Sequence, residues 1–312
     1  ARLYKVDLSG DTITRGAVTV VTKQTLSSDK FLEVAGQGLN PKAAATWQIT
    51  PDVLTYASAS RGFQYGGVNL QAATLSLSAA DHPTFKSSDL WNYEVGARTD
   101  WLDRTLRLDL TLFHLDWNKP QVFQVDDSRT GLNGVYIDNV GAARGNGVEG
   151  TFRYLTPIPG LSLSIAGSYI VLKTATDFIT AAGGTVPSGT DMPLSPRVQT
   201  STTLNYTNYF GPWVVAAAAA QQYQGKAYNN IAHTFEVYDY SIYNLSLNLS
   251  RPDLPLAPSL MLIGSNLTDV RGITGINGIP RDLASGGVPT SSFPPTTYTR
   301  PRSISLRFTA EF

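Results

Sequence analysis

The strongest constraint on the fold is a regular alternation of apolar and polar residues that recurs along most of the chain. In residues 303–312, isoleucine, leucine, phenylalanine and alanine alternate with serine, arginine, threonine and glutamate. Residues 104–112, 161–169, 198–206 and 241–250 repeat the pattern. Successive side chains of a β-strand point to opposite faces, so each segment predicts a strand with one apolar and one polar face. The sequence therefore predicts an all-β fold.

Three features favour a membrane-spanning barrel over a soluble β-sandwich, which also alternates. The segments reach about 9–11 residues, the span of a tilted transmembrane strand, whereas soluble strands usually run about 5–6. Their polar faces are mostly serine, threonine, asparagine and glutamine, as a water-filled lumen would require. The connections alternate in length, as in outer-membrane barrels with short periplasmic turns and long outer loops. Thr50–Asp52, Asp100–Asp103, Thr156–Gly160 and Asn208–Pro212 are short, and Gly62–Leu90, Asn118–Asn146, Lys173–Pro196, Gln224–Tyr238 and Asp269–Arg300 are long.

A sheet inside a membrane has to satisfy all of its backbone hydrogen bonds, because each group left unpaired in hydrocarbon costs several kcal/mol. We therefore expect one transmembrane antiparallel up-and-down β-barrel domain over residues 1–312, with about 12–14 strands in this chain. Residues 1–35 are either strands, with Leu3–Leu8 and Ala17–Thr22 as candidates, or an extracellular loop. The clearest strands are expected near residues 42–49, 52–61, 90–99, 104–117, 143–155, 160–172, 196–207, 212–224, 238–250, 258–266 and 302–312.

Large aromatic residues stand near the expected strand ends. In outer-membrane barrels such residues form girdles at the two membrane interfaces. Packing in an interior core is the alternative. The residues concerned are Tyr4, Trp47, Trp91, Trp101, Trp117 and Trp213.

Composition excludes several classes of protein. Lys and Arg number 24 and Asp and Glu also number 24, so no positive excess is present to neutralise nucleic-acid phosphates. The chain has no cysteine, which excludes disulfide scaffolds and thiolate metal sites. Its longest apolar run, Trp213–Ala220, is far shorter than the roughly 20 residues of a membrane helix. Because no signal peptide follows Ala1, we expect an N-terminus that is processed, truncated or only partly covered.

Catalytic motifs are not evident. His82, His114 and His233 are far apart and lack zinc-site spacing. His114 and Asp116 share a strand face, which suits interfacial polarity better than a catalytic dyad. The nucleophile-elbow and phosphate-loop motifs do not occur. We therefore expect a protein that is not an enzyme, with no cofactor and no metal site.

Five segments, in order along the chain, resemble motifs of the TonB-dependent receptor family. Together they resemble the C-terminal part of that family's barrel, from about residue 40 to residue 312. The segments are Tyr56–Asn69 (YASASRGFQYGGVN), Asn92–Arg98 (NYEVGAR), Asn139–Gly150 (NVGAARGNGVEG), Asn266–Asp269 (NLTD) and Pro301–Phe312 (PRSISLRFTAEF).

The resemblance implies a transporter of the bacterial outer membrane that imports a scarce nutrient such as a ferric siderophore. Family barrels have about 22 strands, so this chain would supply the C-terminal half to two-thirds; a barrel closed by this chain's own strands is the alternative. The implied partners are outer-membrane lipid, a small-molecule ligand such as a ferric chelate, and the TonB complex acting through a plug domain absent from this chain. A passive diffusion porin and a structural or adhesive barrel remain as alternatives.

Candidate binding residues are aromatic and basic side chains on the long connections, where ligand contacts concentrate and where stacking and charge can hold an anionic chelate. The alternative is that they stabilise loops or belong to the outer girdle. They are Phe63, Tyr65, Phe123, Tyr136, Tyr223, Tyr228, His233, Arg281 and Arg300.

Charged residues on the polar strand faces are expected to point into the lumen. They either pair with a plug or form charge ladders that stabilise the wall, and the sequence favours neither. They are Arg98, Arg107, Asp109, Glu149, Arg153, Arg307 and Glu311.

Overall fold

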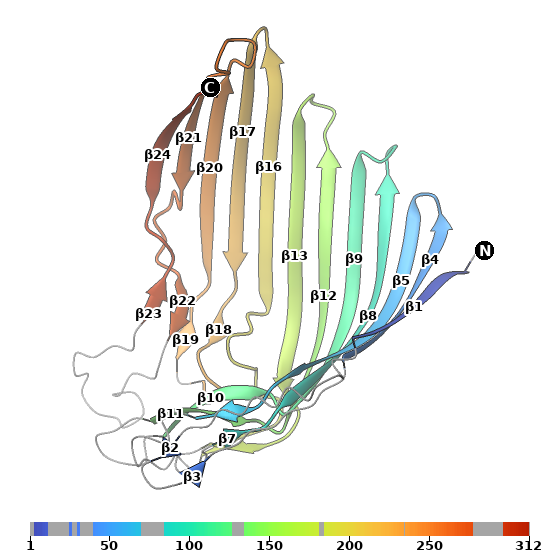
Figure 1. The fold of residues 1–312 in the computed structure, drawn as a ribbon, viewed down its shortest axis with the longest axis vertical. Helices are drawn as coiled ribbons and strands as arrows, with labels where there is room; N and C mark the ends of the chain where they lie inside the picture. Colours follow the sequence, from blue (N-terminus) through green and yellow to red (C-terminus); the bar gives the residue numbers. More distant parts are fainter. Residues whose placement is uncertain are drawn as a thin grey trace.

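One antiparallel sheet of 12 strands forms the body of the molecule (Figure 1). The computed structural model describes residues 3–11, 25–26, 30–31, 40–69, 84–126, 134–180, 184–233, 235–276 and 296–311. The sheet's strands are β1 (Leu3–Asp11), β4 (Asn40–Thr50), β5 (Val53–Gln64), β8 (Ser88–Trp101), β9 (Leu106–Asn118), β12 (Ala142–Leu155), β13 (Leu161–Thr174), β16 (Val198–Phe210), β17 (Trp213–Gln224), β20 (Tyr240–Ser250), β21 (Ser259–Ser265) and β24 (Ser303–Thr309).

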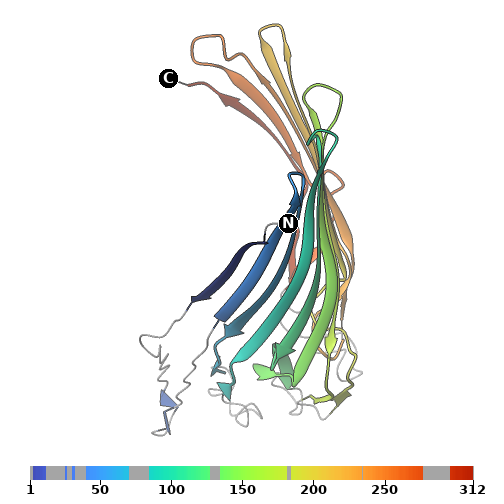
Figure 2. The ribbon, with the colours of Figure 1, turned by 90° about the vertical axis from the view of Figure 1, so that its right-hand side faces the viewer.

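Each strand pairs with its neighbours along the chain, so the topology is up-and-down. Figure 2 shows the sheet as a tall, curved wall. Its order begins at β1 and ends at β24, at opposite edges in Figure 1. The predicted all-β, antiparallel up-and-down fold is confirmed, and 12 strands lie within the expected 12–14. The described residues contain no helix long and apolar enough to cross a membrane.

The connections divide the sheet into two unlike ends. Short turns join β4 to β5, β8 to β9, β12 to β13 and β16 to β17 at the upper end in Figure 1, and the long connections gather at the lower end. The predicted alternation of short and long connections is therefore confirmed. Several long connections contain small two-stranded hairpins that the sequence did not reveal. They are β2 (Thr25–Leu26) with β3 (Lys30–Phe31), β6 (Gly67–Val68) with β7 (Thr84–Phe85), β10 (Gln121–Asp126) with β11 (Gly134–Asn139), β14 (Phe178–Ile179) with β15 (Thr185–Val186), β18 (Ala227–Tyr228) with β19 (Glu236–Val237), and β22 (Ile273–Ile276) with β23 (Thr296–Tyr298).

Two expectations about strand limits need correction. Several strands exceed the expected length: β8, β12 and β13 each have 14 residues. They are longer because the ladder continues past the apolar rows into the first residues of the long connections. At the N-terminus, Leu3–Leu8 is indeed part of a strand, which runs on to Asp11 and pairs with β4. The second candidate there, Ala17–Thr22, lies outside the described residues.

Strand register sorts the side chains onto two faces. Leu112 of β9 lies opposite Val95 of β8 and Val148 of β12. The even-numbered residues that precede it on β9, from position 106 to position 110, are also leucines. These residues form the apolar face, and Leu112 keeps 53% of its surface exposed although it is aliphatic. The odd-numbered residues of β9, including Asp109 and Thr111, form the polar face. An exposed apolar surface that spans neighbouring strands is what lipid would cover.

Tight packing on the polar face joins β5, β8 and β9. Tyr56 lies opposite Gly96, and its ring crosses the glycine to bring its hydroxyl 2.8 Å from the Thr111 Oγ1. A Cβ atom at Gly96 would overlap this ring. Only glycine therefore lets the tyrosine lie flat across the middle strand.

We predict that Gly96→Val destabilises the barrel by about 1–3 kcal/mol, the usual cost of overpacking. The physical reason is that Tyr56 has to leave its site and lose its bond to Thr111. Gly62→Val is the matched control, because Gly62 has the same parity on β5 as Tyr56 and its Cβ would meet nothing within 4 Å. Heat-induced unfolding of the purified protein in detergent measures both. Equal midpoints for the two variants would contradict the packing role.

Candidate ligand-binding end and lumen wall

The long connections fold over one end of the sheet around a small hydrophobic cluster. Val122, Val140, Val186, Met192 and Ile231 come from three different connections and are buried together with Ala143 of β12. Trp117, Leu172 and Phe178 pack against them. The polar face carries Trp117, because it is an odd-numbered residue of β9. Ala143 lies opposite Trp117 and therefore shares this face. Leu172 shares it too, because it lies opposite Gly145, two residues after Ala143 on β12. The cluster therefore draws the connections over the polar side of the sheet.

Trp117 thereby departs from the expected girdle position. Its ring faces the polar side, and its Nε1 donates to the Ser88 Oγ at 2.7 Å. Of the two interpretations of the strand-end aromatics, core packing holds for this residue. Trp91, in contrast, lies on the apolar face, where its ring stacks on Tyr93 with centroids 5.9 Å apart.

Side-chain amides fasten two of the long connections to each other. Asn69 is 6% exposed; its Nδ2 donates to the Ile137 carbonyl and its Oδ1 accepts the Ile137 N–H, both at 2.9 Å. In the reverse direction, Asn139 accepts the Lys86 N–H at 2.6 Å and donates to the Lys86 carbonyl at 3.0 Å. Each amide thus pairs with backbone as a further strand would. We call this pair of contacts the amide clamp.

A third amide fastens the two ends of the last long connection. The Asn266 Nδ2 donates to the Val270 and Arg300 carbonyls, each at 2.8 Å, and its Oδ1 accepts the Val270 N–H. The Asp269 Oδ1 accepts the Arg302 N–H at 2.8 Å. Asn266 and Asp269 begin and end the NLTD motif, so the motif closes the base of this connection.

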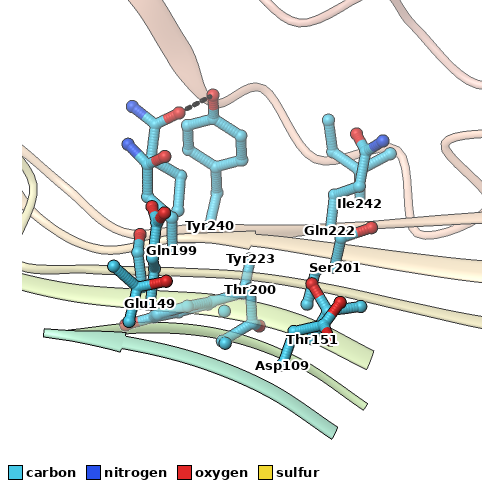
Figure 3. A pocket seen from close by; sticks show the side chains of 16 residues that line it. Asp109, Glu149, Thr151, Gln199, Thr200, Ser201, Gln222, Tyr223, Tyr240 and Ile242 are labelled. Carbon is cyan, nitrogen blue, oxygen red and sulfur yellow. Dashed lines mark hydrogen bonds between the residues drawn. The ribbon is translucent and has the colours of Figure 1, made fainter. Parts of the chain in front are cut away.

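The polar face is hollowed between β9 and β20 (Figure 3). The hollow has a volume of about 600 Å³ and is lined mainly by hydroxyl and amide groups. Asp109 and Glu149 are its two carboxylates, and the Tyr240 hydroxyl donates to the Gln224 Oε1 at 3.2 Å, the dashed line in Figure 3. This wall can hydrate and hydrogen-bond a neighbouring polar surface. Other residues around the hollow are Thr111, Thr151, Ser168, Gln199, Ser201 and Gln222.

The residues expected to face the lumen lie on the polar face. Arg98 Nε contacts Asp109 Oδ1 at 2.9 Å, and Arg107 makes two bonds to Asp100, at 2.6 and 2.9 Å. These pairs form a charge ladder within the wall. Arg153, Glu149 and Arg307 are in no ion pair among the described residues. Glu311 follows β24, and its N–H donates to the Leu256 carbonyl.

The aromatic and basic candidates for ligand contact are not all on loops. Phe63 belongs to β5 and Tyr223 to β17, and the register places both on the apolar face. This corrects the expectation that they sit on the long connections; the ladder runs farther than the sequence pattern indicated. Tyr136 lies on β11 but is only 3% exposed. Arg281 lies outside the described residues.

The remaining candidates lie at the loop end. Phe123 of β10 is 63% exposed, and Tyr65 contacts Phe63 edge to face with ring centroids 4.9 Å apart. Tyr228 and His233 stack on each other at 3.7 Å, and the His233 Nε2 lies 2.7 Å from the Asp191 carbonyl oxygen. Arg300 is exposed beside the Asn266 contact. Within the described part of the chain, His, Asp and Glu form no group of three that could hold a metal ion.

Sequence reasoning missed the amide residues that organise this end. Asn69, Asn139 and Asn266 stood inside motifs that drew attention for other reasons, whereas Gln121 carried no distinctive signal. The Gln121 Nε2 joins the same two connections by donating to the Tyr65 and Lys86 carbonyls, at 2.7 and 3.0 Å. The one sequence feature that points to a role in joining connections is an asparagine two residues after a glycine pair, as Asn69 is after Gly66 and Gly67.

The curved sheet with one apolar face defines the chain as the wall of an outer-membrane β-barrel. Residues 6–267 match the family described as TonB dependent receptor-like, beta-barrel, and the chain belongs to this family. The family is one of receptors and transporters, and its structurally characterised members are outer-membrane barrels.

Individual relatives agree with this assignment. Over 128 residues the chain is 29% identical to the metal-pseudopaline receptor CntO of Pseudomonas aeruginosa, covering 40% of this chain and 16% of that receptor. The ferric yersiniabactin uptake receptor FyuA of Yersinia pestis matches with a TM-score of 0.63 at 17% identity, over 88% of this chain and 37% of that one. The siderophore receptor PiuA of Acinetobacter baumannii matches with a TM-score of 0.62 at 19% identity, over 91% and 37%. The chain thus spans well under half the length of each.

We predict that Asn69→Ala loosens the amide clamp by about 1–3 kcal/mol, because the backbone groups of Ile137 lose their partners. Hydrogen exchange of the Ile137 amide should accelerate accordingly. Asn139→Ala should act on the same two connections, so the double variant should cost less than the sum of the single variants. Strict additivity, or an unchanged exchange rate in Asn69→Ala, would contradict the clamp.

The contact between Asp269 and Arg302 should depend on pH. The Arg302 N–H, helped by the charges of Arg271 and Arg302, holds the pKa of Asp269 below its ordinary value, against desolvation, which raises it. A lowered pKa means that the contribution is present above the unfolded value of about 3.9 and is lost as pH falls through the folded value. Exchange of the Arg302 amide, corrected for its intrinsic rate, should therefore accelerate below about pH 4. Asp269→Asn keeps an acceptor without a charge and should remove this dependence; an unchanged profile would contradict it.

Proposed function

We propose that the whole protein imports a scarce metal chelate, such as a ferric siderophore, across the outer membrane. The observation that carries this proposal is the combination of a lipid-facing wall, a hydrated inner wall and long connections locked together at one end. Family membership supports it. Relatives described as receptors for metal-pseudopaline and ferric yersiniabactin support this ligand class.

Within that protein, residues 1–312 form the C-terminal portion of the barrel domain. The sheet order ends at β1 and β24, and an unpaired strand edge is not tolerated in hydrocarbon. Further strands therefore pair with these edges, giving a barrel of about 22 strands. A lumen of that width requires a seal. We assign this role to a plug domain elsewhere in the protein, on which the TonB complex acts. Glu149, Arg153 and Arg307 are the wall charges available to pair with it.

Exposure decides which candidates contact the ligand. Phe123 and Tyr65 offer accessible aromatic surface beside the amide clamp, and Arg300 offers charge. Tyr136 supports the β10–β11 hairpin from its buried side, and the stacked Tyr228 and His233 stabilise their own connection. Arg281 stays a candidate from the sequence. Nothing in this arrangement calls for covalent chemistry, and we propose that the protein is a transporter without enzymatic activity.

Uptake by cells that carry the full-length gene tests the proposal. Iron-55 bound to a catecholate, a hydroxamate and a carboxylate chelator serves as the probe, with a gene-deletion strain as the reference. We expect one chelate to accumulate only when the gene is present, and to stop accumulating after a protonophore or loss of TonB. Accumulation that needs the gene but continues after the protonophore and after loss of TonB would instead identify a passive porin. Accumulation of all three chelates independent of the gene would contradict import of this ligand class.

We predict that Phe123→Ala weakens binding of the imported chelate by the full-length protein about 5- to 30-fold, equivalent to 1–2 kcal/mol of lost aromatic contact. Tyr209→Ala is the matched control, since Tyr209 is 72% exposed but lies at the short-turn end of β16. Equilibrium binding to purified protein measures both variants. Equal affinities for Phe123→Ala and wild type would remove Phe123 from the ligand site.

A further inference from the structure

A row of charged side chains crosses the apolar face where the strands enter the long connections. The register places Asp116 of β9, Arg144 of β12 and Lys173 of β13 side by side in this row. The next rows toward the short turns are His114, Asn146 and Val171, and then Leu112, Val148 and Tyr169. The charged row lies four positions along the strand from the leucine row, a distance of about 13 Å. The charges thus lie beyond the apolar band but on the same face.

Two cations are neighbours within this row. Arg144 lies directly opposite Lys173, and like charges in that position repel each other. The Arg144 Nε bonds the Asp116 Oδ1 at 2.9 Å, while the side chain stays 69% exposed. The Lys173 backbone pairs with that of Asp191, but its ammonium is in no ion pair within the described part of the chain. The pair therefore presents a guanidinium edge and an ammonium to whatever covers the outer surface.

The surrounding side chains show at which depth the pair lies. Tyr93 stacks on Trp91 and approaches His114 with ring centroids 6.3 Å apart. Trp91 lies opposite Asp116 in the charged row, and Tyr93 lies opposite His114 in the next row. Aromatic rings of this kind lie at the level of lipid headgroups. At the short-turn end, the same face carries Trp101, Leu106 and Tyr154 in one row. The cation pair consequently belongs to the leaflet on the side of the long connections.

We propose that Arg144 and Lys173 bind the phosphate of a lipid headgroup in the outer leaflet. Arginine holds phosphate oxygens through its planar fork and lysine as a point charge, and an anion between them removes their mutual repulsion. Asp116 orients the guanidinium. The site rests on the membrane position of the sheet and not on what the protein imports. A failure of the uptake experiment would leave it unaffected.

Lipid retained by the full-length protein tests this site. After purification from native outer membranes in mild detergent, phosphate-bearing lipid per protein is measured by phosphorus analysis and native mass spectrometry. We expect the double variant Arg144→Gln, Lys173→Gln to retain at least threefold less than wild type. The charge-preserving double variant Arg144→Lys, Lys173→Arg should retain the wild-type amount. Heat-modifiable migration on gels checks assembly, and Arg144→Gln alone replaces the double variant if that fails to assemble.

Arg153→Gln is the matched control. Arg153 lies opposite Arg107, so it has the same cation-beside-cation arrangement, but on the polar face that lipid does not reach. Its retention of lipid should equal that of wild type. Equal retention by the Gln variants and wild type, or equal loss in Arg153→Gln, would overturn the proposal.

A reconstitution separates a lipid headgroup from free phosphate. Delipidated wild type is offered phosphatidylcholine vesicles with and without a phosphorylated glycolipid, and separately inorganic phosphate in detergent. We expect preferential capture of the glycolipid, lost in the Gln variants. Binding of inorganic phosphate with no preference among vesicles would overturn the lipid assignment.

Discussion

Backbone hydrogen bonding in a medium without water is the constraint on which the rest of the structure depends. A strand that crosses hydrocarbon has to pair on both sides, and the ten strands between β1 and β24 meet that requirement within one antiparallel sheet. Because pairing fixes the register, every side chain is assigned to lipid or to water. The leucines at even positions 106–112 of β9, and Arg107, Asp109 and Thr111 between them, follow from that single requirement. Glycine is required where a ring crosses a neighbouring strand, as the ring of Tyr56 does at Gly96.

Outside the membrane, the long connections have to be ordered by contacts among themselves. The long connections are exposed to water, so lipid cannot order them, and they depend on a core of their own around Val140 and Ile231. Buried amides then replace missing strand partners, as Asn69 does for Ile137. A locked set of connections reduces the ordering cost of capturing a ligand, which suits a receptor whose ligand is scarce.

The sequence predicted the parts that obey local periodicity and missed those that depend on tertiary contacts. Period-two alternation was sufficient for the strands, their faces and the two unlike ends, and the charges Arg98 and Asp109 follow from parity alone. The loop hairpins were missed because most of their strands have only two residues, too few to show a period of two. Phe63 and Tyr223 were placed on loops because the pattern does not show how far a ladder continues. Trp117 was ambiguous because its position at a strand end suits both a girdle and a core.

The most direct test of the two-faced wall is a spin-label scan along β9 in the full-length protein. The chain described here has no native cysteine, so single cysteines from position 108 to 113 can be labelled and compared in lipid bilayers. We predict that collisions with oxygen dominate at even positions and collisions with a water-soluble nickel complex dominate at odd positions, with a period of two. Accessibility to the nickel complex at every position, or no alternation at all, would contradict a membrane-spanning wall.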